Sequence, residues 1–200
     1  MEKRNAHRLF SLTLALALCL GLLPAPALAA QTPVEYRYYD TATNQFETGT
    51  CETYTDASNF STTWDAGWYY LPTDSIINKD LTVNGEVHLI LKDGLQLDLG
   101  NNAIQLSPGA SLTIYGQAVG NGRLTAGKGI RVPANTALTI HGGTVAAVGD
   151  DNCAGIGGGY GENGGKITIH GGTVTANGGS RGAGIGGGGD GGGGTVTITG

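Results

Sequence analysis

Apolar and polar residues alternate with a period of two in short runs along the second half of the chain. The run LTIHG places Leu138 and Ile140 on one side and Thr139 and His141 on the other, because successive residues of a β-strand face opposite ways. Runs of the same kind follow as TVAAV at 144–148 and AGIGG at 154–158. Glycine, asparagine and proline separate the runs, so the pattern predicts short strands joined by tight corners.

These strand runs recur at a nearly fixed interval. LTIHGGTV begins at Leu138 and ITIHGGTV at Ile167, an offset of 29 residues, and AGIGGG recurs with the same offset. The interval shortens to 26 residues between Ile104 and Ile130, and aligning HLILKDG with SLTIYGQ gives 23. A unit of 23–29 residues with three short strands is typical of one coil of a solenoid. We therefore predict an all-β fold in which residues 71–200 form a parallel β-helix.

Stacking the coils aligns equivalent residues into columns. The predicted inward columns are Leu112, Leu138, Ile167 and Val196; Ile114, Ile140, Ile169 and Ile198; and Ile104, Ile130, Ile156 and Ile185. The predicted outward row on the same strands is Thr113, Thr139, Thr168 and Thr197. Each buried branched side chain contributes roughly 1.5–3 kcal/mol. A single coil is not stable alone, but the stack is.

Glycine is abundant, with 37 of 200 residues, and two stretches imitate nucleotide-binding motifs. They are GRLTAGKG at 122–129 and the glycines at 182, 184 and 187. Neither stretch is followed by a helical pattern whose N-terminus would hold a phosphate. Glycine also suits solenoid corners, because it adopts positive φ without steric cost. We interpret the glycines as corner residues and expect no cofactor.

Candidate metal ligands are sparse. Asp150 and Asp151 are adjacent in one predicted corner, where carboxylate oxygens suit calcium. His141 and His170 are one period apart, so they should stack on the outward face of adjacent coils. Two imidazoles without a third ligand are more often an exposed ladder than a metal site. We predict a solvated corner at the first place, an exposed ladder at the second, and no bound metal.

Ten of the twelve aromatic residues beyond residue 29 lie between Tyr36 and Tyr70. This shift in composition marks residues 30–70 as a separate region, whose Thr, Tyr and Trp content favours strands. We predict a β cap that covers the first coil; a sugar-stacking platform is the alternative. The candidate ligand-contacting residues of the whole chain are Trp64, Trp68, Tyr69, Tyr70, Tyr115, His141 and His170.

Residues 1–29 have the pattern of a secretory signal peptide. The basic stretch MEKRNAHR precedes the apolar run LFSLTLALALCLGLLP, and the small residues of APALAA follow. The apolar run is shorter than the roughly 20 residues needed to span a bilayer. We predict cleavage between Ala29 and Ala30, export to the medium or the cell surface, and no membrane insertion afterwards.

Removal of residues 1–29 leaves 8 basic and 15 acidic side chains, a formal net charge of −7 instead of −5. Nucleic acid and anionic lipid are therefore not expected as partners, since both require a basic patch. Two cysteines remain, Cys51 and Cys153, about a hundred residues apart. This spacing is not a disulfide framework, and we predict two unpaired thiols.

A set of longer motifs occurs in order along the chain: TCETYT, TTWDAGWYYL, LTVNGEVHLILKDG, LTIYGQ, GIRVP and ITIHGGTVTANGGSRGAGIGGG. In order and composition, nearly all of residues 34–200 resembles the N-terminal region of secreted and surface repeat proteins of gut Gram-positive anaerobes. It is also similar to β-helical adhesins and carbohydrate-binding β-helix domains. The resemblance implies a right-handed parallel β-helix displayed outside the cell. It carries over no catalytic residues.

The expected function is that of a secreted or cell-surface β-helical repeat protein, acting as an adhesin or glycan-contacting scaffold without catalysis. The expected partner is an extracellular glycan or a host or bacterial surface protein, because long repetitive faces suit weak multivalent contact. Two alternatives remain. One is a polysaccharide-degrading lyase or hydrolase, which needs clustered carboxylates or a carboxylate-bound metal beside a basic residue. The other is a passive surface stalk with no ligand.

The last predicted coil begins with VTITG and stops at Gly200 without a polar capping element. An uncovered coil presents unpaired backbone groups and an apolar column headed by Val196 and Ile198. We expect either that the solenoid is incomplete here and continues in a longer protein, or that the open coil mediates self-association.

Overall fold

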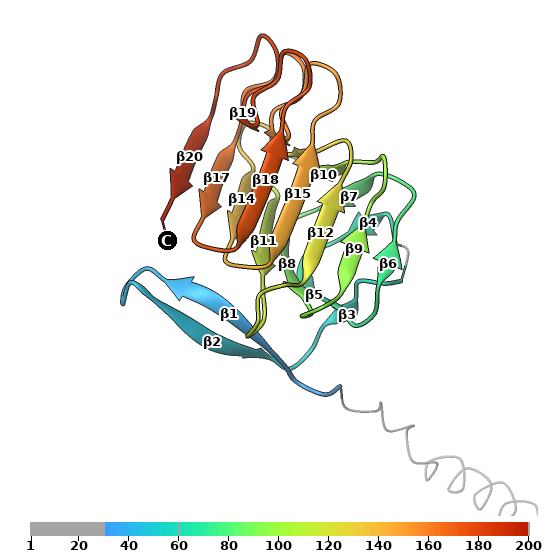
Figure 1. Ribbon diagram of the computed structural model, residues 1–200, viewed down its shortest axis with the longest axis vertical. Helices are drawn as coiled ribbons and strands as arrows, with labels where there is room; N and C mark the ends of the chain where they lie inside the picture. Colours follow the sequence, from blue (N-terminus) through green and yellow to red (C-terminus); the bar gives the residue numbers. More distant parts are fainter. Residues whose placement is uncertain (1–30, 60, 200) are drawn as a thin grey trace, which may run out of the picture. The chain divides into compact units, whose positions relative to one another are not determined.

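The computed structural model describes residues 31–59 and 61–199 (Figure 1). The predicted signal peptide and its cleavage site at Ala29 and Ala30 lie outside the described residues. The described chain forms twenty strands, and none of its residues lies in a helix. Accordingly, this part of the chain contains no helix long and apolar enough to cross a membrane.

Three parallel sheets surround a common interior (Figure 1). The seven-stranded sheet contains β3 (Thr55–Asp56), β5 (Gly67–Leu71), β8 (Glu86–Leu91), β11 (Ser111–Tyr115), β14 (Ala137–Ile140), β17 (Lys166–Ile169) and β20 (Thr195–Ile198). The six-stranded sheet contains β4 (Thr63–Trp64), β7 (Leu81–Val83), β10 (Ile104–Leu106), β13 (Ile130–Arg131), β16 (Ile156–Gly157) and β19 (Ile185–Gly186). The five-stranded sheet contains β6 (Ser75–Ile76), β9 (Gln96–Asp98), β12 (Arg123–Ala126), β15 (Thr144–Val148) and β18 (Thr173–Asn177).

From β5 onward, consecutive strands belong to the three parallel sheets in turn, so three strands make one coil. The strands from β5 to β19 form five complete coils of this kind, and neighbouring coils pair in parallel. The predicted parallel β-helix is therefore confirmed.

The strand register confirms that the predicted columns align, although Val196 and Ile198 in the last strand are 42% and 67% exposed. Ile140 pairs with Ile114 on one side and with Ile169 on the other, and Ile130 pairs with Ile104 and Ile156. Ile140 and Ile130 are completely buried. The apolar residues of all three sheets converge on one continuous core.

The predicted 23-residue offset at the N-terminal end is wrong. Ser111 pairs with Glu86, 25 residues earlier, rather than with His88. A shift of two residues keeps every side chain on the same face of the strand. The apolar pattern therefore fits both registers equally well, and the lengths of the corners between the strands decide between them.

Glycines at equivalent positions of the six-stranded sheet let successive coils approach closely. Gly157 and Gly186 pair across adjacent coils with φ angles of 141° and 140°, a region that side-chain-bearing residues rarely adopt. A Cβ on Gly157 would overlap the carbonyl oxygen of Gly186. The stretch that imitates a phosphate loop, 122–129, contains β12 and a corner.

The aromatic region expected at residues 30–70 contains a hairpin, two short strands and most of β5. An antiparallel hairpin of β1 (Val34–Asp40) and β2 (Gln45–Cys51) comes first, then β3 and β4, which precede the first complete coil. The expected division at residue 70 falls inside β5, which pairs with β8 along its whole length. At this end of the interior, Trp64 is 1% exposed and stacks on Tyr69 with ring centroids 4.6 Å apart.

The hairpin lies across the carboxyl ends of strands of the seven-stranded sheet (Figure 1). Arg37 N–H donates to the carbonyl of Gly116 at 2.9 Å, and Gln117 Nε2 donates to the carbonyl of Glu35 at 2.9 Å. Cys51 at the base of the hairpin and Cys153 in a corner are both buried and free. Burial raises the pKa of the Cys51 thiol.

Candidate functional site

A second apolar cluster lies between the hairpin and the outward face of the seven-stranded sheet. Tyr70, Ile90 and Tyr115 occupy one outward column of that sheet. The hairpin covers this column with Val34 and Cys51 from its base, and all five side chains are buried. Further aromatic rings packed against the cluster are Tyr36, Tyr38, Tyr54 and Trp68. An outward column that the solenoid alone would expose to water is thus closed by the hairpin.

Stacked rings continue from this cluster along the coils. Tyr115 stacks on His141 with ring centroids 5.2 Å apart, and His141 stacks on His170 at 5.0 Å and an interplanar angle of 14°. The prediction that the two histidines stack on adjacent coils is confirmed. The prediction that this ladder is exposed is wrong, because Tyr39 of the hairpin stacks on His170, which is only 8% exposed.

The two histidines make different hydrogen bonds through Nδ1. The backbone N–H of Tyr39 donates to His141 Nδ1 at 2.9 Å. Because an amide N–H can only donate, this nitrogen of His141 carries no proton. His170 Nδ1 bonds the hydroxyl of Thr199 at 2.8 Å. Burial, and then the neighbouring His170, lower the pKa of His141 to about 4, and burial lowers the pKa of His170.

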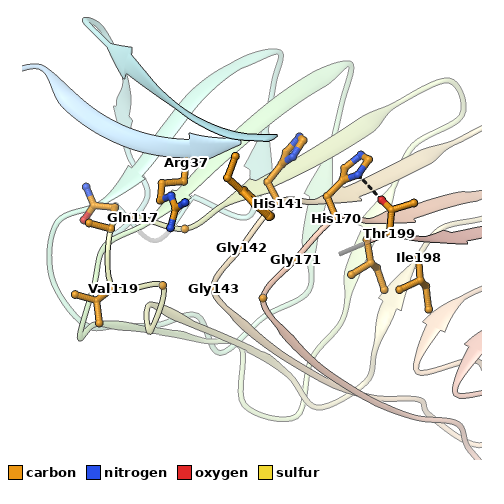
Figure 2. Close-up of a pocket in the computed structure, with 16 residues that line it drawn as sticks. Arg37, Gln117, Val119, His141, Gly142, Gly143, His170, Gly171, Ile198 and Thr199 are labelled. Carbon is orange, nitrogen blue, oxygen red and sulfur yellow. Dashed lines mark hydrogen bonds between the residues drawn. The ribbon is translucent and has the colours of Figure 1, made fainter. Parts of the chain in front are cut away.

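A groove of about 500 Å³ opens beside the hairpin, where the seven-stranded sheet turns into the next corner. It is lined by Arg37, Phe46, Gly116, Gln117, Ala118, Val119, Gly120, His141, Gly142, Gly143, Ile169, His170, Gly171, Gly172, Ile198 and Thr199. Figure 2 shows Arg37 reaching from the hairpin towards Gln117, with the rings of His141 and His170 side by side.

The groove depends on a close fit between the hairpin and a glycine corner. A Cβ on Gly171 would come within 2.7 Å of the tip of the Phe46 ring, so a larger residue here would displace this ring. The Arg37 guanidinium lies over the Phe46 ring, with its carbon 5.4 Å from the ring centre. This distance is within the range of a cation–π contact. Phe46 therefore helps to position the guanidinium in the groove.

The opposite wall is the loop at 116–121, which Asp93 holds in place. The Asp93 carboxylate accepts the backbone N–H groups of Val119 and Gly120, both at 2.8 Å. Gln117 Oε1 in turn accepts the N–H of Asp93 at 3.2 Å. The same Gln117 side chain donates to the Glu35 carbonyl of the hairpin, so it connects this loop to the hairpin on the other side of the groove.

Arg37 is the only charged side chain among the lining residues, and none of them is Asp or Glu. Within residues 31–59 and 61–199, no three His, Cys, Asp or Glu residues are grouped to hold a metal ion. At the other predicted candidate, Asp150 lies 3.5 Å from Lys128, and Asp151 accepts a bond from Ser180. These carboxylates are engaged by neighbouring side chains.

The seven residues predicted to contact a ligand are divided among three environments. Trp64 and Tyr69 lie inside the solenoid; Tyr70 and Tyr115 are buried under the hairpin. Trp68 is half-buried, with His88 stacked on it at 4.3 Å. Only His141 and His170 line the groove.

The groove residues that sequence reasoning missed are Arg37, Phe46 and Gln117. The alternation in VEYRYYD and QFETGTC, on either side of TATN, is a signal for the hairpin. Nothing in that signal indicates which face of the solenoid the hairpin covers. The glycine pairs that follow His141 and His170 mark the corner but not its partner.

The comparison with known protein families supports the same architecture. A family model described as a beta helix repeat matches residues 138–160 and 167–189. These two segments correspond to the coils β14–β16 and β17–β19. No curated protein and no solved structure matches the chain. In its last two complete coils, the chain is similar to the beta helix repeat family.

Proposed function

We propose that this protein is a secreted or cell-surface β-helical repeat protein that contacts a glycan through the hairpin groove, without catalysis. The observation that carries the proposal is the groove itself, which combines exposed apolar walls with hydrogen-bond donors. Its volume of about 500 Å³ lies within the roughly 300–1,000 Å³ of ligand sites in proteins.

The walls suit the mixed chemistry of a sugar ring, which has apolar C–H faces and polar edges. Phe46 and Val119 are 37% and 73% exposed, and they offer apolar contact along the groove. Arg37 offers guanidinium N–H donors between them and forms no ion pair with any described residue. A fixed positive charge without a carboxylate nearby favours a sugar that carries an anionic group.

The same lining argues for binding rather than cleavage. Hydrolysis of a glycosidic bond generally uses two carboxyl groups on opposite sides of the bond. No Asp or Glu lines this groove. Its titratable groups are two histidines whose pKa values burial lowers, so both are neutral at pH 7. Retention of a glycan without product release is therefore the expected behaviour.

A polysaccharide panel tests the proposal by scoring retention and the release of reducing or unsaturated ends in the same samples. Phe46→Ala should lose at least about tenfold in affinity, since it removes apolar contact and the support of Arg37. Val148→Ala is the control, because Val148 is 47% exposed and lies outside this groove and outside the depression at Arg131 and Glu162. Equal loss in both variants would contradict the site. No retention of any glycan would favour a passive stalk.

A polysaccharide-degrading enzyme is the second candidate, favoured by one observation. Arg131, Tyr160 and Glu162 line another depression, of about 450 Å³, and both Arg131 and Glu162 reach the space beside Gly159. A carboxylate beside a basic residue is the minimum such chemistry needs. Product release that disappears in Glu162→Gln would establish this candidate and overturn the non-catalytic proposal.

A further inference from the structure

We propose that the hairpin is a pH-sensitive clasp: it is docked and completes the groove while His141 is neutral, and its outer part releases when His141 takes up a proton. The clasp regulates the site described above, so its functional consequence rests on the proposed glycan binding. The docking equilibrium itself does not, because it concerns only contacts within this chain.

The first argument is the direction of one hydrogen bond. Tyr39 N–H donates to His141 Nδ1 at 2.9 Å, and this requires an unprotonated nitrogen at that position. A protonated imidazole carries N–H groups on both nitrogens. The attraction between Tyr39 and His141 is then replaced by two N–H groups that face each other. Docking of β1 at this point is therefore incompatible with the charged ring.

The second argument is the contrast with His170. Its Nδ1 bonds the Thr199 hydroxyl at 2.8 Å, and a hydroxyl can either donate or accept. Protonation of His170 can be accommodated by rotation of that hydroxyl, whereas the backbone amide facing His141 cannot change its role. His141 is thus the sensing residue, and His170 is the neighbour whose charge would add repulsion.

The groups that face His141 include no carboxylate that could pair with a positive charge. Tyr38 and Tyr39 approach from β1, Tyr115 from β11 and His170 from the coil above. Arg37 lines the same groove and is itself positive; no carboxylate lines it. The low pKa of His141, about 4, has burial and the proximity of His170 as its causes. The docked state consequently disfavours the proton.

The remaining docking contacts predict where release begins. The base of the hairpin is held by the buried cluster that contains Val34 and Cys51. The outer part is held by Tyr39, which contacts both histidines, and by Phe46, which packs against Gly171. Loss of the Tyr39 contacts frees the part that carries Phe46. The groove then loses the side that Phe46 forms, while the base of the hairpin stays docked.

The pKa of His141 in the docked and released states sets the direction and the pH range of the change in hairpin docking. An exposed histidine has a pKa near 6.5, whereas that of docked His141 is about 4. The docked state binds fewer protons, so docking is fully favourable above about pH 6.5 and weakens as pH falls towards 4. For one proton, the docking constant should fall about twentyfold between pH 7 and pH 5.

Hydrogen–deuterium exchange of the exported chain tests the clasp without any ligand. The readout is the protection of hairpin amides relative to interior strands such as β14, which corrects for the intrinsic pH dependence of exchange. Hairpin protection should fall at least tenfold at pH 5 relative to pH 7, while β14 keeps its protection. Equal relative protection at both pH values would overturn the proposal.

Two variants sharpen the test. His141→Gln retains an oxygen that can accept from Tyr39 but cannot titrate, so its hairpin should stay protected at pH 5. His88→Gln tests the other histidine near the hairpin, since His88 stacks on Trp68 at 4.3 Å and bonds the Tyr115 hydroxyl at 3.1 Å but lies outside the groove; its hairpin should still open at pH 5. If His141→Gln opens like the wild type at pH 5, His141 is not the sensor and the proposal fails.

A measurement on the unsubstituted chain keeps the test independent of how well a variant docks. Nuclear magnetic resonance titration of the histidine ring protons should show that His141 takes up its proton over the pH range in which hairpin amides lose protection. Titration of His141 near pH 6.5 with the hairpin fully docked would overturn the proposal. Glycan retention is measured separately at pH 7 and pH 5. Clasp opening without glycan retention at either pH refutes the proposed function and leaves the clasp intact.

Discussion

The interior of the solenoid and the face beneath the hairpin are both closed by apolar side chains, but they are built in different ways. The interior repeats, so that Ile114, Ile140 and Ile169 occupy equivalent positions of successive coils. The hairpin face does not repeat, because each outward residue meets a different part of β1. Ile90 meets the base and His170 meets Tyr39.

The difference shows how a solenoid acquires a specific site. A repeated inward column stabilises the stack and gives each coil the same surroundings. A ligand groove needs unequal surroundings, and here a segment from outside the repeat supplies them. The hairpin crosses several coils, so the side chains along its length bring together Arg37, Phe46 and the two histidines at one end.

The largest expected effect is a charge placed in the interior. Ile140→Asp puts a carboxylate with no partner into a completely buried column, which should cost at least about 4 kcal/mol of unfolding free energy. Thr139→Asp, at the next and outward position of β14, should cost less than about 1 kcal/mol. Chemical denaturation measures both. Equal losses would mean that inward and outward faces are wrongly assigned.

A smaller effect separates the two tryptophans, one in each region. Trp64→Ala removes a 1%-exposed ring from the end of the interior and should cost about 3–5 kcal/mol of global stability. Trp68→Ala removes a half-buried ring that contacts Tyr36 at 4.9 Å, and should cost about 1–2 kcal/mol, mostly as weaker hairpin docking. Denaturation and hairpin amide exchange together distinguish them. A larger global loss for Trp68→Ala would reverse the comparison.

The smallest expected effect concerns the hairpin alone. Gly171→Ala places a Cβ against the Phe46 ring and should weaken docking of the outer hairpin by about 1–2 kcal/mol. Gly193→Ala is the matched control, since a Cβ there meets nothing within 4 Å. Exchange of hairpin amides reports the loss, while interior amides should be unaffected. Hairpin protection unchanged by Gly171→Ala would show that Phe46 does not depend on this corner.

Much of the solenoid was predictable because its evidence lies in repetition. The alternation in LTIHG gave the inward face, and the recurrence of that run gave the partner strands, since identical coils can stack in only one compatible way. The error at Ser111 arose where the repeat is weakest and two registers bury the same face. There the corner length, which hydrophobic alternation does not encode, selects the pairing.

The candidate site was only partly predictable. His141 and His170 stood out because they recur one period apart, and both line the groove. Tyr70 was expected in a cap or a sugar-stacking platform, and Tyr115 on the outward face of the solenoid. They are buried because the hairpin covers them. Arg37 and Phe46 carry no periodic signal that separates them from other strand residues.

The sequence by itself determined the β-helix, its inward columns and the glycine corners, because each depends on local periodicity and on contacts between equivalent residues. The tertiary structure alone decided that the hairpin covers the outward aromatic column and donates Tyr39 N–H to His141, 102 residues away in the chain. The physical reason is that no repeat relates the hairpin to the coils. Its position is selected by the packing of particular rings and by single hydrogen bonds, which appear only once the chain has folded.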